Sequence, residues 1–193
     1  QEFSVNADPI IAERVPRELA VFQRAIKQSL RELEQAKQQL LERVGKAEAR
    51  ILDSQMMILQ DPILVDDVLE RIRRHHCNAR YAFHTRMKEL IALFEANSQP
   101  VIRERAADLG DLYNRMMSLL AESGPVMSSE APLQHLTEGA VLVGHTLNPS
   151  HVVKLKQGQV LAFVTDTGGR TSHVSILARA LKIPAVAGLG NIT

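Results

Sequence analysis

Apolar residues recur along residues 17–44 at the spacing of an amphipathic helix. They follow one another at intervals of three, four and seven residues, and charged residues fill the gaps. The members of this stripe are Leu19, Phe22, Ile26, Leu30, Leu33, Leu40 and Val44. Because this spacing puts the apolar side chains on one face, we predict a long helix that begins at Pro16 and weakens at Gly45. Residues 1–16 show no strong period and form a leading segment.

Four further helices follow the first one. The apolar pattern predicts them at about 47–59, 62–75, 78–96 and 101–121. Asp61 and Pro62 are a cap and a first helical residue, and the Asn-Ser-Gln-Pro run at 97–100 separates the last two helices. Short connections between amphipathic helices are typical of a helical bundle, which we place at 17–122.

The pattern changes after residue 122. Ser, Gly and Pro are frequent at 123–139 and indicate a linker. Short β-branched runs at 140–143 and 160–164 then predict strands, with a short helix opened by Asn148, Pro149 and Ser150 between them. We therefore predict a two-domain protein of class α and α/β, with an α/β domain at 140–193 that we expect to be incomplete.

Composition narrows the functional classes. The 23 basic and 22 acidic residues give a net charge of +1, so the overall charge favours neither nucleic acid nor an anionic membrane as partner. Cys77 is the single cysteine, which rules out an intrachain disulfide framework. No apolar run is long enough to span a membrane, and we expect a cytoplasmic protein.

The residues around His173 combine a strand, a glycine turn and a helix start. Gly168 and Gly169 follow the strand, and Thr171 and Ser172 stand where a helix cap belongs. The free amides and the dipole at a helix start favour an anion and a neutral imidazole, which is a nucleophile. Arg170 could pair with phosphate oxygens. These residue types suggest a phosphoryl-accepting histidine. The alternative, which residue types alone favour because short motifs often match by accident, is a histidine that merely caps a helix.

The motif resembles a known family. Residues 168–179 (Gly-Gly-Arg-Thr-Ser-His-Val-Ser-Ile-Leu-Ala-Arg) and 182–188 (Lys-Ile-Pro-Ala-Val-Ala-Gly) are similar to the phosphohistidine signature of the phosphoenolpyruvate-utilising enzymes. The resemblance implies that His173 carries the phosphoryl group. It also implies a phosphate-binding or positioning role for a set of nearby residues. These are Gly168, Gly169, Arg170, Thr171, Ser172 and Asn148.

The chain as a whole resembles the amino-terminal region of enzyme I of the sugar phosphotransferase system, or its nitrogen-system paralogue. That resemblance implies a helical domain that binds the phosphocarrier HPr, followed by a swivelling phosphohistidine domain. Residues 56–64 look like the helix-break-helix that contacts HPr, which implies partner-binding roles for Met57, Ile58 and Leu64. The resemblance also implies that phosphoenolpyruvate and Mg²⁺ bind a carboxy-terminal barrel outside this chain, so no cofactor is expected here.

Some features depart from the sugar-system pattern or leave alternatives open. Asn148 stands where that enzyme usually has a threonine, and Gln55, Gln60 and Pro62 occupy stretches where more acidic contacts are expected. The identity of the carrier therefore stays open. Two other readings are an interaction module with a silent His173 and the enzyme I-like region of a dihydroxyacetone-kinase subunit.

The run His75-His76-Cys77 looks like a set of metal ligands. Adjacent helical residues point apart, and no second pair of ligands is obvious in the sequence. We therefore expect no metal site there.

Overall fold

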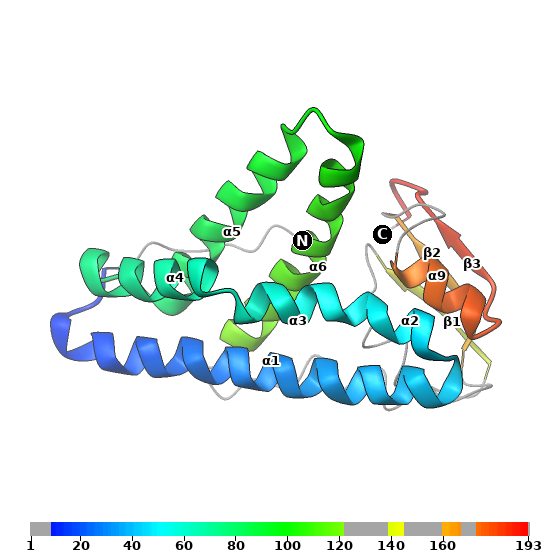
Figure 1. Ribbon diagram of the computed structural model, residues 1–193, viewed down its shortest axis with the longest axis horizontal. Coiled ribbons are helices and arrows are strands. Elements are labelled where there is room, and N and C mark those ends of the chain that lie inside the picture. The colour runs from blue at the N-terminus through cyan, green and yellow to red at the C-terminus, as the bar shows by residue number, and fades with distance from the viewer. Residues whose placement is uncertain (1–8, 122–138, 145–159, 167–172, 193) are drawn as a thin grey trace. The chain divides into compact units, whose positions relative to one another are not determined.

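The computed structural model describes residues 9–121, 139–144, 160–166 and 173–192 (Figure 1). The chain divides into two units, which are described separately. One unit contains Glu2–Arg31 and Ser54–Met127, and the other contains Glu32–Asp53 and Ser128–Thr193. The segment Glu32–Asp53 thus groups with the α/β part of the chain, whereas we placed it in the helical domain. The predicted domain boundaries stay predictions.

The long first helix is confirmed as α1, Val15–Arg43, preceded by the 3-10 helix η1, Ala12–Arg14. Phe22, Leu33 and Leu40 from the predicted stripe are buried. Three small residues complete the buried face: Ala25, Ser29 and Ala36. The predicted stripe did not include them because it consisted of large apolar side chains. The helix ends just before Gly45, whose φ of 132° is unfavourable for other residues.

The second predicted helical segment, 47–59, is helical throughout but is interrupted by a 3-10 turn. The chain forms α2 (Lys46–Ala49), the 3-10 helix η2 (Arg50–Leu52) and α3 (Asp53–Gln60). The apolar residues of this stretch cover more than one face, so one continuous helix could not bury them together. The tighter 3-10 turn rotates the chain, and Leu52, Gln55 and Leu59 end up buried.

The remaining helices are α4 (Pro62–His75), α5 (Ala79–Glu95) and α6 (Pro100–Ala121). Asp61 caps α4 by accepting a hydrogen bond from the amide of Ile63 at 2.9 Å, as its position before Pro62 predicted. Figure 1 shows α5 beside α6, and α5 also packs against α4. Fully buried Phe83 on α5 joins these helices to α1, because its ring lies 6.1 Å from that of Phe22 and 6.5 Å from that of Tyr113.

The α/β unit contains a parallel three-stranded sheet. Its strands are β1 (Ala140–Gly144), β2 (Val160–Thr165) and β3 (Ala185–Ala187), in the order β1-β2-β3. The helix α9 (His173–Ala180) lies between β2 and β3 in the chain and packs near β3. Buried Phe163 on β2 and buried Leu177 and Ala178 on α9 form the core of this unit. Because β2 pairs with both β1 and β3, it is the central strand. Along the chain, α9 is the next described helix after its carboxyl end.

Candidate functional site

The carboxyl ends of β1, β2 and β3 lie at one edge of the sheet, because all three strands are parallel. This is the edge where open α/β sheets bind their ligands. The amide of Asp166, the first residue after β2, donates to the carbonyl of Gly144 at the end of β1, at 3.3 Å. The central strand thus delivers the chain to this edge, and the next described residue along the chain is His173.

His173 is the first residue of α9, as the sequence predicted. The first amides of a helix have no partners within the helix, and the helix dipole adds positive potential at this end. Both effects favour a bound anion and disfavour a second proton on an imidazole placed there. The backbone position therefore suits a histidine that holds an anionic group.

The other residues predicted for this site lie outside the described part of the chain. Their roles stay predictions from the sequence. They are Asn148, Gly168, Gly169, Arg170, Thr171 and Ser172.

A loop after β3 completes the described part of this edge. The carbonyl of Thr165 accepts hydrogen bonds from the amides of Gly188 at 3.1 Å and Leu189 at 3.3 Å. The carbonyl of Asp166 accepts one from the amide of Gly190 at 3.1 Å. Our reading of the sequence gave this loop no role. In the sequence, the two glycines at 188 and 190 are the feature that could have indicated a turn here. Their φ values of 85° and 84° favour glycine.

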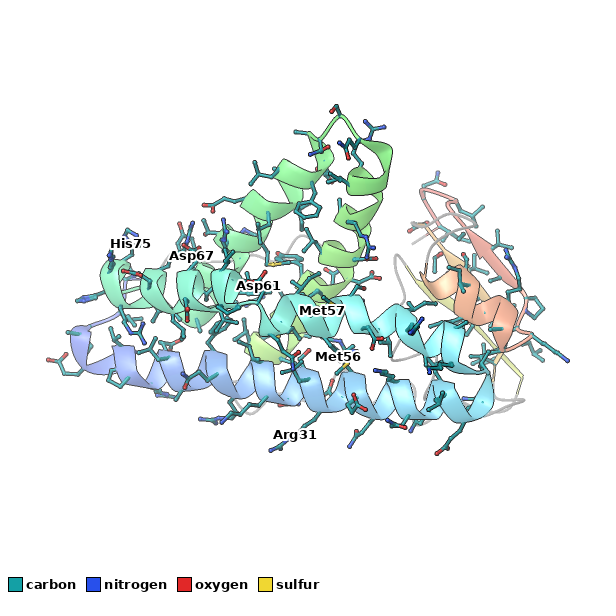
Figure 2. The ribbon with its side chains drawn as sticks, in the orientation of Figure 1. Arg31, Met56, Met57, Asp61, Asp67 and His75 are labelled. Carbon is teal, nitrogen blue, oxygen red and sulfur yellow. The ribbon has the colours of Figure 1, made fainter. Side chains whose placement is uncertain are left out.

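The residues predicted to contact a partner lie around the junction of α3 and α4 (Figure 2). Met57 on α3 is 70% exposed, and Ile58 is half-buried. Leu64 is only 4% exposed because it faces the core, whereas its neighbour Ile63 is 72% exposed. Ile63 therefore replaces Leu64 as the apolar residue of α4 that is available to a partner.

Gln55 also differs from its expected place. It lies in a stretch where the resemblance leads us to expect acidic contacts, but it is only 2% exposed. The accessible surface of this junction therefore consists of Met57, Gln60, Asp61, Pro62 and Ile63. It combines two large apolar side chains with few charges.

A network of ion pairs fixes α4 to α5 next to this junction. Arg71 on α4 makes two hydrogen bonds to the carboxylate of Glu89 on α5, at 2.9 and 2.7 Å, and a third to Asp67 at 2.8 Å. Arg86 on α5 lies 3.1 Å from the same Asp67 carboxylate. The hydrogen bond to Glu89 is the main reason why the pKa of Arg71 is raised further above its usual value. Arginines of the same molecule therefore compensate the negative charges of the Asp67 and Glu89 carboxylates.

The run His75-His76-Cys77 shows separate environments for its side chains. His75 and His76 are exposed, whereas Cys77 is buried and its Sγ donates to the carbonyl of Arg71 at 3.6 Å. Burial raises the pKa of the Cys77 thiol, which disfavours the thiolate that a metal needs. Among the described residues, no group of three His, Cys, Asp or Glu side chains is placed to hold a metal ion.

Comparison with known proteins identifies the family. The family model described as PEP-utilising enzyme, N-terminal, matches residues 2–105, and the one described as PEP-utilising enzyme, mobile domain, matches residues 136–193. The chain belongs to the PEP-utilising enzymes. The mobile-domain match includes His173 and the strands around it. The N-terminal match includes α1 to α5.

Relatives of known name agree with this family. A phosphoenolpyruvate-protein phosphotransferase of Bacillus sp. (strain S) is 36% identical over 179 residues, which are 93% of this chain and 30% of the relative. That of Mycoplasma capricolum is 33% identical over 194 residues, covering 100% of this chain and 33% of the relative. The chain therefore spans about a third of the length of these relatives.

Solved structures of PEP-utilising enzymes have the same fold. A solution structure of Enzyme I (nEIt) matches with a TM-score of 0.76 at 34% identity and covers 100% of this chain and 75% of that one. The N-terminal domain of Enzyme 1 - Nitrogen matches with a TM-score of 0.68 at 23% identity, covering 96% of this chain and 72% of that one. The second likeness concerns the fold alone. Among the described residues, no helix is both long and apolar enough to cross a membrane.

Proposed function

We propose that this chain is the amino-terminal phosphoryl-relay part of a phosphoenolpyruvate-protein phosphotransferase. In this proposal His173 accepts a phosphoryl group that originates from phosphoenolpyruvate and passes it to a histidine of an HPr-type carrier. The observation that supports it most is the place of His173. It opens α9 after the central strand of a parallel sheet, within the segment that matches the mobile domain of PEP-utilising enzymes.

The proposed chemistry uses a neutral imidazole nitrogen, by resemblance Nε2, as the nucleophile. Its lone pair attacks phosphorus, a P–N bond forms, and the bond from phosphorus to the donor atom breaks with its electron pair leaving on the donor. Phosphoryl transfer depends mainly on positioning and charge stabilisation. The free amides at the start of α9 would stabilise the phosphoryl oxygens, and Arg170 is expected to add a positive charge.

The α3–α4 junction is the surface that we propose for the carrier. Exposed Met57 and Ile63 offer adaptable apolar contact, and the capped start of α4 fixes the backbone between them. Half-buried Ile58 would contribute at the edge. The carboxylates of Asp67 and Glu89 are paired with arginines, so in this proposal they do not serve as contacts for a basic carrier.

The full phosphotransferase needs more than this chain. The relatives are about three times as long, and the resemblance implies that phosphoenolpyruvate and Mg²⁺ bind their remaining part. We therefore expect the 193-residue chain to exchange phosphate with a phosphorylated carrier and not to react with phosphoenolpyruvate itself.

A back-transfer assay tests the relay. The protein is mixed with phosphorylated HPr, and separately with its nitrogen-system counterpart, and intact mass spectrometry detects one added phosphate. We expect an acid-labile adduct that is lost in His173→Ala and kept in His75→Ala, a control that removes an exposed histidine.

Two results would contradict the proposal. An unchanged adduct in His173→Ala would exclude His173 as the acceptor. A folded wild-type protein that takes phosphate from neither carrier would favour the interaction-module reading. Transfer from only one of the carriers would name the pathway.

A further inference from the structure

Asp166 is a buried carboxylate at the carboxyl edge of the sheet. It is 5% exposed and comes directly after β2, the central strand. Buried carboxylates are rare unless hydrogen bonds compensate for the loss of water. The surroundings of Asp166 therefore indicate what its side chain is needed for.

The carboxylate holds the loop that follows β3. Its Oδ1 accepts a hydrogen bond from the amide of Ile192 at 2.5 Å, and its main-chain carbonyl accepts one from Gly190 at 3.1 Å. The two amides before Gly190 bind the carbonyl of Thr165. Thr165, the last residue of β2, and Asp166, which follows it, thus accept hydrogen bonds from four amides of the loop 188–192.

The same residue also connects the strand ends to one another. The amide of Asp166 donates to Gly144 at the end of β1, while its acceptors hold the loop that leaves β3. The hydrogen bonds of Asp166 therefore connect the end of β1 with the loop that follows β3. Among the described residues, Asp166 is also the last one before His173 along the chain.

We propose that Asp166 is a positioning residue for phosphoryl transfer at His173, because its carboxylate locks the loop 188–192 against the edge of the sheet from which the histidine segment starts. This inference rests on the proposed function of His173. The carboxylate acts through a hydrogen bond to a backbone amide, so an amide oxygen in its place keeps most of the effect. Asp166 does not touch the phosphoryl group in this proposal.

The test compares four variants in the back-transfer assay. We expect Asp166→Ala to lower the transfer rate at saturating carrier by about tenfold to a hundredfold, the size of effect that a small misplacement produces. The carrier concentration at half-maximal rate stays unchanged, because α3 and α4 are untouched. Asp166→Asn recovers the rate to within about fivefold, since its oxygen still accepts from Ile192. Leu189→Ala, which trims an exposed side chain of the same loop, has no effect.

A fourth variant covers the case in which Asp166→Ala fails to fold. Gly190→Ala meets no atom within 4 Å, but its φ of +84° strains any other residue, so it disturbs the loop without removing the carboxylate. We expect it to slow transfer as well. Wild-type rates in folded Asp166→Ala or Gly190→Ala would overturn the proposal, and so would an Asp166→Asn variant as slow as Asp166→Ala.

The imidazole signals of His173 separate this inference from the proposed function. In ¹⁵N-resolved NMR spectra, we expect Asp166→Ala to shift the ring nitrogens of His173 and Leu189→Ala to leave them in place. This readout does not need phosphoryl transfer. A wild-type protein that takes no phosphate contradicts the relay, whereas unchanged His173 signals in Asp166→Ala contradict the role of Asp166.

Discussion

Among the residues that the structure describes, two other than glycine adopt the left-handed backbone conformation. His76, with a φ of 45°, follows the last residue of α4, and Lys182, with a φ of 57°, lies two residues after α9. Glycine is the usual residue at such helix ends, because a side chain with a Cβ raises the energy of this conformation. A glycine at either position should therefore increase the free energy of unfolding.

We predict that His76→Gly stabilises the helical unit by about 0.5–1 kcal/mol. The backbone hydrogen bond from the amide of Ile10 to the carbonyl of residue 76, at 2.7 Å, does not depend on the side chain. The neighbouring variant His75→Gly is the control. It is the last residue of α4, with helical backbone, and should lose stability, by at most about 1 kcal/mol, because glycine disfavours a helix. Urea unfolding measures both, and a loss of stability in His76→Gly would contradict the prediction.

At the scale of elements, Arg71 and Arg86 connect α4 to α5 through Asp67 and Glu89. The Arg71 side chain is 26% exposed and joins two helices, whereas the Arg74 side chain is 73% exposed and pairs with Glu70 on its own helix. Two-pronged and partly buried ion pairs are stronger than exposed pairs within one helix. Arg71 and Arg74 are therefore a matched pair of test positions on α4.

We predict that Arg71→Ala destabilises the protein by about 1–3 kcal/mol and Arg74→Ala by less than about 0.5 kcal/mol. The first change leaves Asp67 and Glu89 close to each other with less positive charge between them. Chemical unfolding at low and high salt measures both variants. Equal losses for the two would show that the network does not fix α4 to α5.

Helix positions followed from the sequence because local signals mark them. Asp61 before Pro62 sets the start of α4, and Asn78 caps α5 by accepting from the amide of Tyr81 at 2.7 Å. The orientation of neighbouring apolar residues is different. Ile63 and Leu64 are both apolar and adjacent, so the sequence could not say which one faces the core. Packing against other helices decides it, and Leu64 is the buried one.

Long-range contacts were also invisible in the sequence. Glu18 on α1 accepts a hydrogen bond from the amide of Ala79, the first residue of α5, at 2.9 Å. The two residues are 61 positions apart, and no local pattern connects them. The bond from Ile192 to Asp166 spans 26 positions in the same way. In contrast, the place of His173 at a helix start could be predicted, because its neighbours in the chain define it.

At the scale of the whole molecule, two partly buried groups give the stability opposite dependences on pH. Burial and the neighbouring Asp108 raise the pKa of Asp111 to about 7, although Arg115 opposes this. The folded state then binds a proton more tightly than the unfolded state, so stability falls as the pH rises from about 4 to 7. We predict that Asp111→Asn matches wild type near pH 4 and exceeds its stability above pH 7, by on the order of 2 kcal/mol.

His84 gives the stability the opposite dependence on pH. It accepts or donates a hydrogen bond with the Tyr113 hydroxyl at 2.8 Å, and burial, with Lys88 and Arg80 nearby, lowers its pKa. The unfolded state then binds the proton more tightly, so His84 destabilises the fold as the pH falls below about 6.5. We predict that His84→Gln gains stability relative to wild type only on acidification, opposite to Asp111→Asn.

Thermal unfolding of both variants from pH 4 to 8 measures these two dependences. Asp66→Asn, at an exposed position of α4, serves as the control for removing a carboxylate. Parallel curves for His84→Gln and Asp111→Asn would contradict the assignment. Curves that diverge in opposite directions would show that Asp111 and His84 oppose each other in the pH dependence of the wild-type stability.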